Sequence, residues 1–300
     1  MADQSVPMPI RHVLLALLTV AIWGFNFVVI KLSVEALPPI LAAALRFFFA
    51  ALPAVFFVRP PKAPWYLVVG FGLALGVALY AFLNLSIAWG MPAGLSSLVL
   101  QVQAFFTMGL AFLLLGERPS RFQVMGAVVA FGGIGVIALE RVGETALVPL
   151  TMTLLAALSW GLANVLTRKA GKVNAVSFTV WGALAAPLPL LALSLLIEGP
   201  EAVGAALSDF GWSDAALIAF LAYPATLLGG GIWSWLLGQH PATVVAPFTL
   251  LVPITGVLSG HLILGEVITL PEIAGGALVI LGLMVTLMRG KPPVVAVRLD

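Results

Sequence analysis

The sequence is a succession of long apolar stretches separated by short polar turns, and this pattern limits what the chain can fold into. A helix needs roughly 20 apolar residues to cross the hydrocarbon core of a membrane. Strands are excluded because the stretches are continuously apolar, and an open sheet would leave unpaired backbone groups in lipid. We therefore predict an all-α integral membrane protein with ten transmembrane helices, near residues 11–33, 38–58, 64–88, 93–115, 120–140, 148–169, 175–197, 213–237, 243–264 and 271–288.

Composition agrees with the membrane assignment and removes several classes of function. Hydrophobic residues make up 62% of the chain and charged residues 9%, which leaves too little polar surface for a soluble domain. The net charge of +2 is not gathered on a basic face, so nucleic acid is not an expected partner. There is no cysteine, and the histidines lack metal-ligand spacing. We expect no metal, no cofactor and no enzymatic activity.

The distribution of lysine and arginine predicts the orientation, because cationic loops stay in the cytoplasm. With the N-terminus inside, only Lys31 and Arg141 fall outside, and Arg46 lies within the second predicted helix. The inner cations are Arg11, Arg59, Lys62, Arg118, Arg121, Arg168, Lys169, Lys172, Arg289, Lys291 and Arg298. We expect a multi-pass protein of a bacterial-type inner membrane with both termini in the cytoplasm.

Several motifs occur twice, which predicts an internal duplication. The pairs are Trp23-Gly24 with Trp160-Gly161, Pro92-Ala93 with Pro241-Ala242, Gly116-Glu117 with Gly265-Glu266, Gly126 with Gly275, and Gly133 with Gly282. The first pair is offset by 137 residues and the others by 149, so about 12 residues (149 minus 137) entered the second copy. Five helices per half make the halves antiparallel, as in many transporters. We predict two inverted five-helix repeats, residues 1–144 and 145–300, around a central cavity.

The inserted residues are expected in the loop from Glu198 to Asp214, as a short amphipathic helix on the outer surface. Glu117 and Glu266 close repeat-related helices beside glycine. We expect these two glutamates to anchor helix ends or neighbouring helices.

Some of these motifs also carry a resemblance to a known family. They are the Trp-Gly of the first helix, the mid-helix Arg46, the Leu-Gly-Glu that closes the fourth and ninth helices, and the Gly-Ala-Val and Gly-Gly-Ala-Leu of the helices that follow. With them the chain resembles the EamA-type drug/metabolite transporter superfamily over almost its whole length, and within it the YddG-like amino-acid exporters. The resemblance implies a ten-helix inner-membrane carrier that exports aromatic and other neutral amino acids through a central cavity.

The candidate substrate-binding residues are polar or aromatic and lie far from the helix ends, because inverted-repeat carriers bind substrates near the bilayer midplane. The two Trp-Gly motifs are each followed by an asparagine, so one helical face presents an indole and an amide. Such a face could hold a small zwitterion, or it could let helices pack closely. The candidates are Trp23, Asn26, Tyr80, Asn84, Gln101, Trp160 and Asn164.

Other conspicuous side chains are given structural roles. We expect Arg46 to snorkel or to pair with Glu35 or Glu266. His261 is expected to be a hydrogen-bonded packing residue. An interfacial belt explains the tryptophans near predicted helix ends, which are Trp65, Trp89, Trp212, Trp233 and Trp235.

Prolines and glycines in the eighth and ninth helices predict where the backbone bends. We take Gly230, Pro247 and Pro253 as candidate gating residues, acting with the third and fourth helices. The fourth helix has no corresponding prolines, so we expect the bending to be asymmetric between the halves.

These features favour a carrier that exports neutral amino acids, aromatic and other apolar ones among them, from the cytoplasm by facilitated alternating access. Two alternatives stay open. A transporter of nucleotide sugars or phosphorylated metabolites would want two or more buried cations. A membrane receptor or scaffold would not need an inverted duplication. We expect neutral amino acids and the lipid bilayer as partners, and a monomer.

Overall fold

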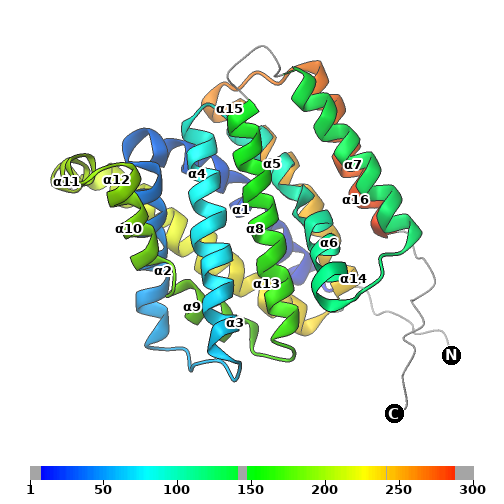
Figure 1. Ribbon diagram of the computed structural model, residues 1–300, viewed down its shortest axis with the longest axis horizontal. Helices are drawn as coiled ribbons and strands as arrows, with labels where there is room; N and C mark the ends of the chain where they lie inside the picture. Colours follow the sequence, from blue (N-terminus) through cyan, green and yellow to red (C-terminus); the bar gives the residue numbers. More distant parts are fainter. Residues whose placement is uncertain (1–7, 141–146, 241, 288–300) are drawn as a thin grey trace.

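The computed structural model of the protein describes residues 8–140, 147–240 and 242–287, and all regular structure in these ranges is helical (Figure 1). The predicted repeat boundary at residues 144 and 145 lies outside them, as do Arg141, Arg289, Lys291 and Arg298. In chain order the elements are α1 (Ile10–Ala36), α2 (Pro39–Val55), α3 (Trp65–Gly72), η1 (Leu73–Leu79), α4 (Tyr80–Ala88), α5 (Ala93–Val99), η2 (Leu100–Val102), α6 (Gln103–Leu115), α7 (Arg121–Glu140), α8 (Leu147–Lys169), α9 (Ala175–Ala183), α10 (Pro187–Ile197), α11 (Pro200–Ser208), α12 (Trp212–Phe220), η3 (Leu221–Leu228), α13 (Gly229–Gln239), α14 (Ala242–Val245), η4 (Ala246–Leu251), α15 (Val252–Leu264) and α16 (Leu270–Leu287).

Helices occupy each of the apolar regions predicted from the sequence. Eight helical stretches are long and apolar enough to cross a membrane, and two shorter apolar helices, Pro39–Val55 and Leu270–Thr286, accompany them. The predicted helix in the loop after Glu198 is confirmed as α11, Pro200–Ser208. The chain is therefore an all-helical, multi-pass membrane protein over the residues described.

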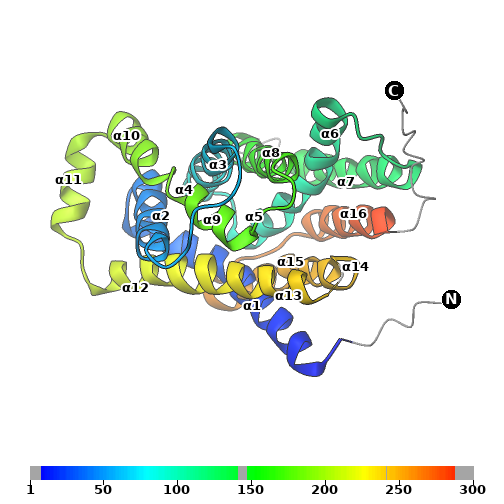
Figure 2. The ribbon, with the colours of Figure 1, turned by 90° about the horizontal axis from the view of Figure 1, so that it is seen from below.

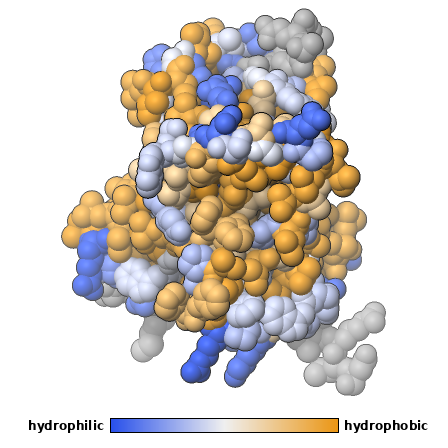
Figure 3. Space-filling model, turned by 90° about the vertical axis from the view of Figure 1, so that its left-hand side faces the viewer, coloured by the Kyte–Doolittle hydropathy of each residue, from blue (hydrophilic) through white to orange (hydrophobic). Residues whose placement is uncertain are grey.

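The surface is that of a protein surrounded by lipid. Large apolar side chains are exposed along several helices, among them Leu113 at 73%, Val128 at 69% and Leu188 at 78% exposure. Figure 3 shows apolar residues across one face, with hydrophilic residues gathered mainly toward its two ends. A soluble monomer rarely exposes such continuous apolar surface, whereas a bilayer covers it without cost.

Helices from the two predicted halves pack against one another in matched pairs. α1 lies against α15 and α13, and α8 lies against α6 and the α3–η1–α4 helix. α16 runs along the length of α7 at one side of the molecule, as Figures 1 and 2 show. α2 packs against α9 and α10 at the other side. The centre of the molecule is thus enclosed by helices from both ends of the sequence.

Repeated glycines make the closest of these contacts possible. A Cβ atom on Gly126 would collide with the carbonyl oxygen of Gly282, and a Cβ on Gly282 with that of Gly126. Gly133 and Gly275 block each other in the same way further along α7 and α16. Small residues that let backbones approach are the usual means of packing helices in lipid, where the hydrophobic effect no longer drives association.

Two glutamates cap helices that begin far away in the sequence. α2 and α5 have proline at their N-caps, so no side chain there can accept from the first free N–H groups. Glu198 accepts from the N–H groups of Ile40 and Leu41, at 2.6 and 3.2 Å. Glu266 accepts from Ala93 and Gly94, at 2.6 and 2.9 Å, which confirms its expected anchoring role.

The repeat partner of Glu266 has a different contact. Glu117 forms an ion pair with Arg168 on α8, at 2.9 Å, between two side chains that are about half exposed. Glu117 therefore anchors a neighbouring helix, as expected, but with an exposed ion pair in place of a helix cap.

Candidate functional site

A cavity of about 430 Å³ lies in the centre of the helices. Its walls come from α1, α2, the α3–η1–α4 helix, α8, α9 and the η3–α13 helix, with smaller contributions from η2, α6, η4 and α15. Pockets for small ligands have volumes of about 300–1,000 Å³. The cavity therefore has room for a molecule of metabolite size between the two halves of the chain.

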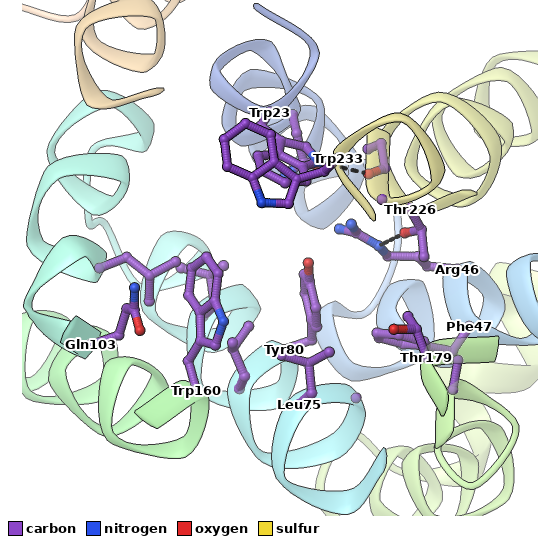
Figure 4. A pocket seen from close by; sticks show the side chains of 18 of the residues that line it. Trp23, Arg46, Phe47, Leu75, Tyr80, Gln103, Trp160, Thr179, Thr226 and Trp233 are labelled. Carbon is purple, nitrogen blue, oxygen red and sulfur yellow. Dashed lines mark hydrogen bonds between the residues drawn. The ribbon is translucent and has the colours of Figure 1, made fainter. Parts of the chain in front are cut away.

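Aromatic side chains form much of the cavity wall. The ring centres of Trp23 and Trp233 are 5.3 Å apart, and the indole N–H of Trp23 donates to the carbonyl of Ala225 at 3.0 Å. In Figure 4, Trp160 lies across the open space from Arg46, with Tyr80 between them and Trp23 and Trp233 above. Flat faces on three sides suit a ligand with an apolar or aromatic body.

Arg46 supplies the charge in this cavity. Its side chain is only 3% exposed, and its guanidinium carbon lies 4.2 Å from the ring centre of Tyr80. Nε donates to Oγ1 of Thr226 at 3.0 Å, a bond drawn in Figure 4. One of the two terminal nitrogens, Nη1, is buried and has no hydrogen-bond partner. A cation enclosed by aromatic rings and left partly unpaired is a feature of a binding site rather than of a packed core.

The expected contacts of Arg46 were wrong. Glu35 pairs with Lys31 at 3.0 Å, and the carboxylate of Glu266 caps α5. Arg46 also does not snorkel to the surface, because its guanidinium is buried in the cavity wall. The signal in the sequence was the position of this cation within an apolar helix, where a charged side chain usually faces the interior of the bundle or a cavity.

Amides line the remaining wall. The Nδ2 group of Asn164 donates to Oε1 of Gln103 at 2.8 Å and to Oγ1 of Thr107 at 3.1 Å, which joins α8 to α6. Asn26 is 6% exposed, and its Oδ1 atom has no partner. Gln101 is buried, with a long contact of 3.5 Å from Nε2 to the carbonyl of Ser97. Asn26 and Gln101 therefore keep amide groups that have few or long hydrogen bonds within the protein.

The structure brings six of the seven candidate substrate-binding residues to this cavity: Trp23, Asn26, Tyr80, Gln101, Trp160 and Asn164. Asn84 is elsewhere, because its Nδ2 group donates to the carbonyl of Pro39 at 2.9 Å and the residue is 2% exposed. Sequence reasoning did not choose Arg46 and Gln103 and placed Trp233 in the interfacial belt, whereas all three line the cavity. The other four belt tryptophans, Trp65, Trp89, Trp212 and Trp235, are exposed.

The candidate gating residues are spread over different places. Gly230 lines the cavity, and a Cβ atom there would meet nothing within 4 Å. Pro247 and Pro253 do not line it: they stand at the first turns of η4 and α15, where proline is well tolerated. These two prolines therefore lie at the start of η4 and just after its end, and neither is in the interior of an α-helix.

Irregular backbone segments occur at matching positions in both halves, although only those of the second half contain proline. π-helical segments occur at η1 and η3, and 3-10 segments at η2 and η4. Adding the repeat offset of 149 to Leu73–Leu79 gives residues 222–228, within η3, and adding it to Leu100–Val102 gives 249–251, within η4. All four segments contribute residues to the cavity. Interrupted helices are typical of substrate sites in membrane carriers, and they form here without proline in the first half.

Comparison with known proteins identifies the family. The EamA-like transporter family matches residues 10–139 and again residues 147–288. A protein of Salmonella typhimurium named a probable amino-acid metabolite efflux pump is 42% identical, over 90% of this chain and 93% of its own length. A protein of Escherichia coli with the same name is 39% identical over the same shares of both chains. A solved crystal structure with 18% identity covers 92% of this chain and 95% of its own at a TM-score of 0.58, which shows a shared fold.

The match spans nearly all the described helices, including those that enclose the cavity. The function of the chain is therefore to be sought in transport across the membrane and not in catalysis. The chain belongs to the EamA-like transporter family and is a membrane transporter.

Proposed function

We propose that the protein exports neutral amino acids, aromatic and other apolar ones among them, from the cytoplasm by facilitated alternating access through the central cavity. The observation that carries the proposal is the composition of the cavity wall. Aromatic faces from Trp23, Trp160 and Trp233 surround an unpaired donor on Arg46 and an unpaired acceptor on Asn26. Such a set complements an apolar side chain, a carboxylate and an ammonium group. The names of the Salmonella and E. coli relatives support the same class of cargo.

The arrangement proposed for this carrier is ten transmembrane helices in two inverted repeats, residues 1–144 and 145–300. Reciprocal contacts support it. Gly24 of α1 abuts Thr255 and Gly256, while Gly161 of α8 abuts Phe106 and Thr107, the positions 149 residues earlier. The glycines of α7 and α16 show the same relation. Gly126 contacts Gly282 and Gly133 contacts Gly275, and each of these partners lies 149 residues after the other glycine of α7. A twofold relation between antiparallel halves produces contacts of this kind.

We further propose that the carrier is a monomer in a bacterial inner membrane with both termini in the cytoplasm. The distribution of lysine and arginine supports this orientation. A carrier of phosphorylated metabolites is less well supported, because Arg46 is the one cation among the described residues that line the cavity.

Transport by the purified protein in proteoliposomes tests the function. Vesicles preloaded with phenylalanine should accumulate radiolabelled phenylalanine by counterflow, with saturation, and tryptophan, methionine and threonine should compete. Lysine and glutamate should compete poorly. Competition by lysine or glutamate alone would overturn the substrate assignment, and the absence of flux with every amino acid would overturn the proposed function.

Replacing Gly230 by alanine is expected to slow this counterflow without loss of folding. Alanine fits, since nothing lies within 4 Å of the added Cβ. It also stabilises the helical conformation next to η3 by about 1 kcal/mol, which makes bending there less favourable. Gly109→Ala is the matched control, because Gly109 is also unobstructed in a helix but does not line the cavity. Equal rates in the two variants, at equal melting temperatures, would remove Gly230 from the gating mechanism.

A further inference from the structure

We infer that Arg46 binds the carboxylate of the substrate and that the cavity selects for this carboxylate, not for the ammonium group. The inference rests on the proposed transport function and goes further, because it assigns the recognised group. It predicts that the same site also binds aromatic and apolar monocarboxylates that have no free amine.

The contacts of Arg46 leave one edge of its guanidinium group available. Thr226 donates its hydroxyl hydrogen to the carbonyl of Leu221 at 2.8 Å, so its oxygen can only accept from Nε of Arg46. This bond and the ring of Tyr80 hold the plane of the guanidinium. Nη1 remains buried and unpartnered, and in Figure 4 the terminal nitrogens of Arg46 point into the open space. The group is thus held in position, with its terminal end toward the cavity.

The charge of Arg46 also needs a counterion from the ligand. Among the described residues, none of those lining the cavity is an aspartate or glutamate. A buried cation without a partner is costly in a low-dielectric interior. A carboxylate placed at the terminal nitrogens of Arg46 forms a charge-assisted hydrogen bond and neutralises the site. Binding energy therefore depends strongly on whether the ligand carries an anion.

The same lack of acidic residues makes the ammonium group of an amino acid dispensable. The partners that the cavity offers it are neutral, among them the side-chain oxygens of Asn26 and Gln101 and the faces of the aromatic rings. These contacts replace hydration, but they do not provide the countercharge that a buried ammonium group would need. Removing the amine leaves the pairing between Arg46 and the carboxylate intact. Acylated or deaminated acids should therefore bind at least as well as the amino acid.

Quenching of intrinsic tryptophan fluorescence in detergent tests the inference directly, since three tryptophans line the cavity. The ligands are phenylalanine, N-acetyl-phenylalanine, 3-phenylpropionate and phenylalanine amide. We expect the three carboxylates to bind with similar affinity, or the two without a free amine more tightly, and the amide to bind about tenfold more weakly or worse. An amide that binds as well as phenylalanine, or an acid without an amine that does not bind, would overturn the inference.

Two variants separate Arg46 from the rest of the wall. In Arg46→Gln the carboxylates and the amide should bind with equal, weak affinity, whereas Arg46→Lys should keep part of the preference for carboxylates. Arg168→Gln is the control, because Arg168 is half exposed and pairs with Glu117 outside the cavity. A preference that survives in a folded Arg46→Gln variant would overturn the assignment to this residue.

The binding experiment does not depend on transport, so the two proposals fail separately. Preferential binding of carboxylates without any counterflow would contradict the proposed carrier function and leave the inference intact. Counterflow of phenylalanine that the amide inhibits as strongly as unlabelled phenylalanine would support the carrier and overturn the inference.

Discussion

Replacing Gly24 by alanine is expected to lower the melting temperature of the protein by several degrees. The new Cβ atom would overlap the hydroxyl of Thr255 and lie 2.6 Å from its Cβ and 2.8 Å from the backbone nitrogen of Gly256. The backbone of α15 cannot step aside, because Gly256 itself packs against Ser97 of α5. Overpacking of this kind costs about 1–3 kcal/mol, and the helix preference of alanine over glycine offsets only about 1 kcal/mol of it.

The effect should reach the cavity as well as the stability. Thr255 donates to the carbonyl of Val20 at 3.2 Å or to carbonyls of its own helix, so displacing it loosens α1 from α15. Trp23 precedes Gly24 and would shift with α1. Thermal unfolding in detergent, followed by tryptophan fluorescence, measures the stability.

Gly135→Ala is the control for this substitution. A Cβ atom at Gly135 meets nothing within 4 Å, so this variant should be as stable as the original protein or more stable. If Gly24→Ala and Gly135→Ala unfold at the same temperature, the close contact between α1 and α15 does not limit stability.

The sequence was a good guide to the helices, for a physical reason. Hydropathy over a membrane span is a strong, local signal, and lipid leaves few alternatives to a helix. The irregular segments within the helices were less predictable. The prolines and glycines of the eighth predicted helix indicated the one at η3, which contains Pro224. No proline marks η1 and η2, which pack against α8 of the other half.

The sequence predicted the cavity-lining residues best where a polar or aromatic side chain lies deep in the membrane and has to face the protein interior. Trp23, Gln101 and Trp160 line the cavity as the mid-helix rule suggests. The rule fails for Asn84, four residues after Tyr80 on the same side of one helix, because a backbone carbonyl at the start of α2 takes up its donor. No pattern in a single sequence reveals which neighbouring helix offers such a partner.

Arg46 and Trp233 were misjudged because their roles depend on tertiary contacts. Trp233 lies close to a predicted helix end, but α13 continues to Gln239, and the indole turns inward onto Trp23. Arg46 had acidic residues within plausible reach, and those acids turned out to have partners of their own. In both cases the residue type and its depth could be read from the sequence, but its contacts depend on helices that are distant along the chain.

Replacing Glu266 by glutamine is expected to destabilise the protein by about 2 kcal/mol, because two buried N–H groups depend on the carboxylate. Each oxygen of Glu266 accepts one bond, from Ala93 and from Gly94 at the start of α5. Glutamine has one oxygen, so one N–H group loses its acceptor and faces an amide donor. The negative charge that stabilises the N-terminal end of the helix is also lost. Chemical or thermal unfolding in detergent should show the change.

Glu117→Gln is a control supplied by the duplication itself, since Glu117 occupies the position 149 residues before Glu266. Its carboxylate pairs with Arg168, and both side chains are about half exposed. Exposed ion pairs contribute less than about 1 kcal/mol, so this variant should lose little stability. Equal losses of stability in the two variants would mean that capping of α5 is not the reason why Glu266 stabilises the protein. A larger loss of stability in Glu266→Gln would show that the two copies of the Gly-Glu motif have different structural roles. Glu266 caps α5, whose N-cap residue is a proline that cannot accept a hydrogen bond through its side chain.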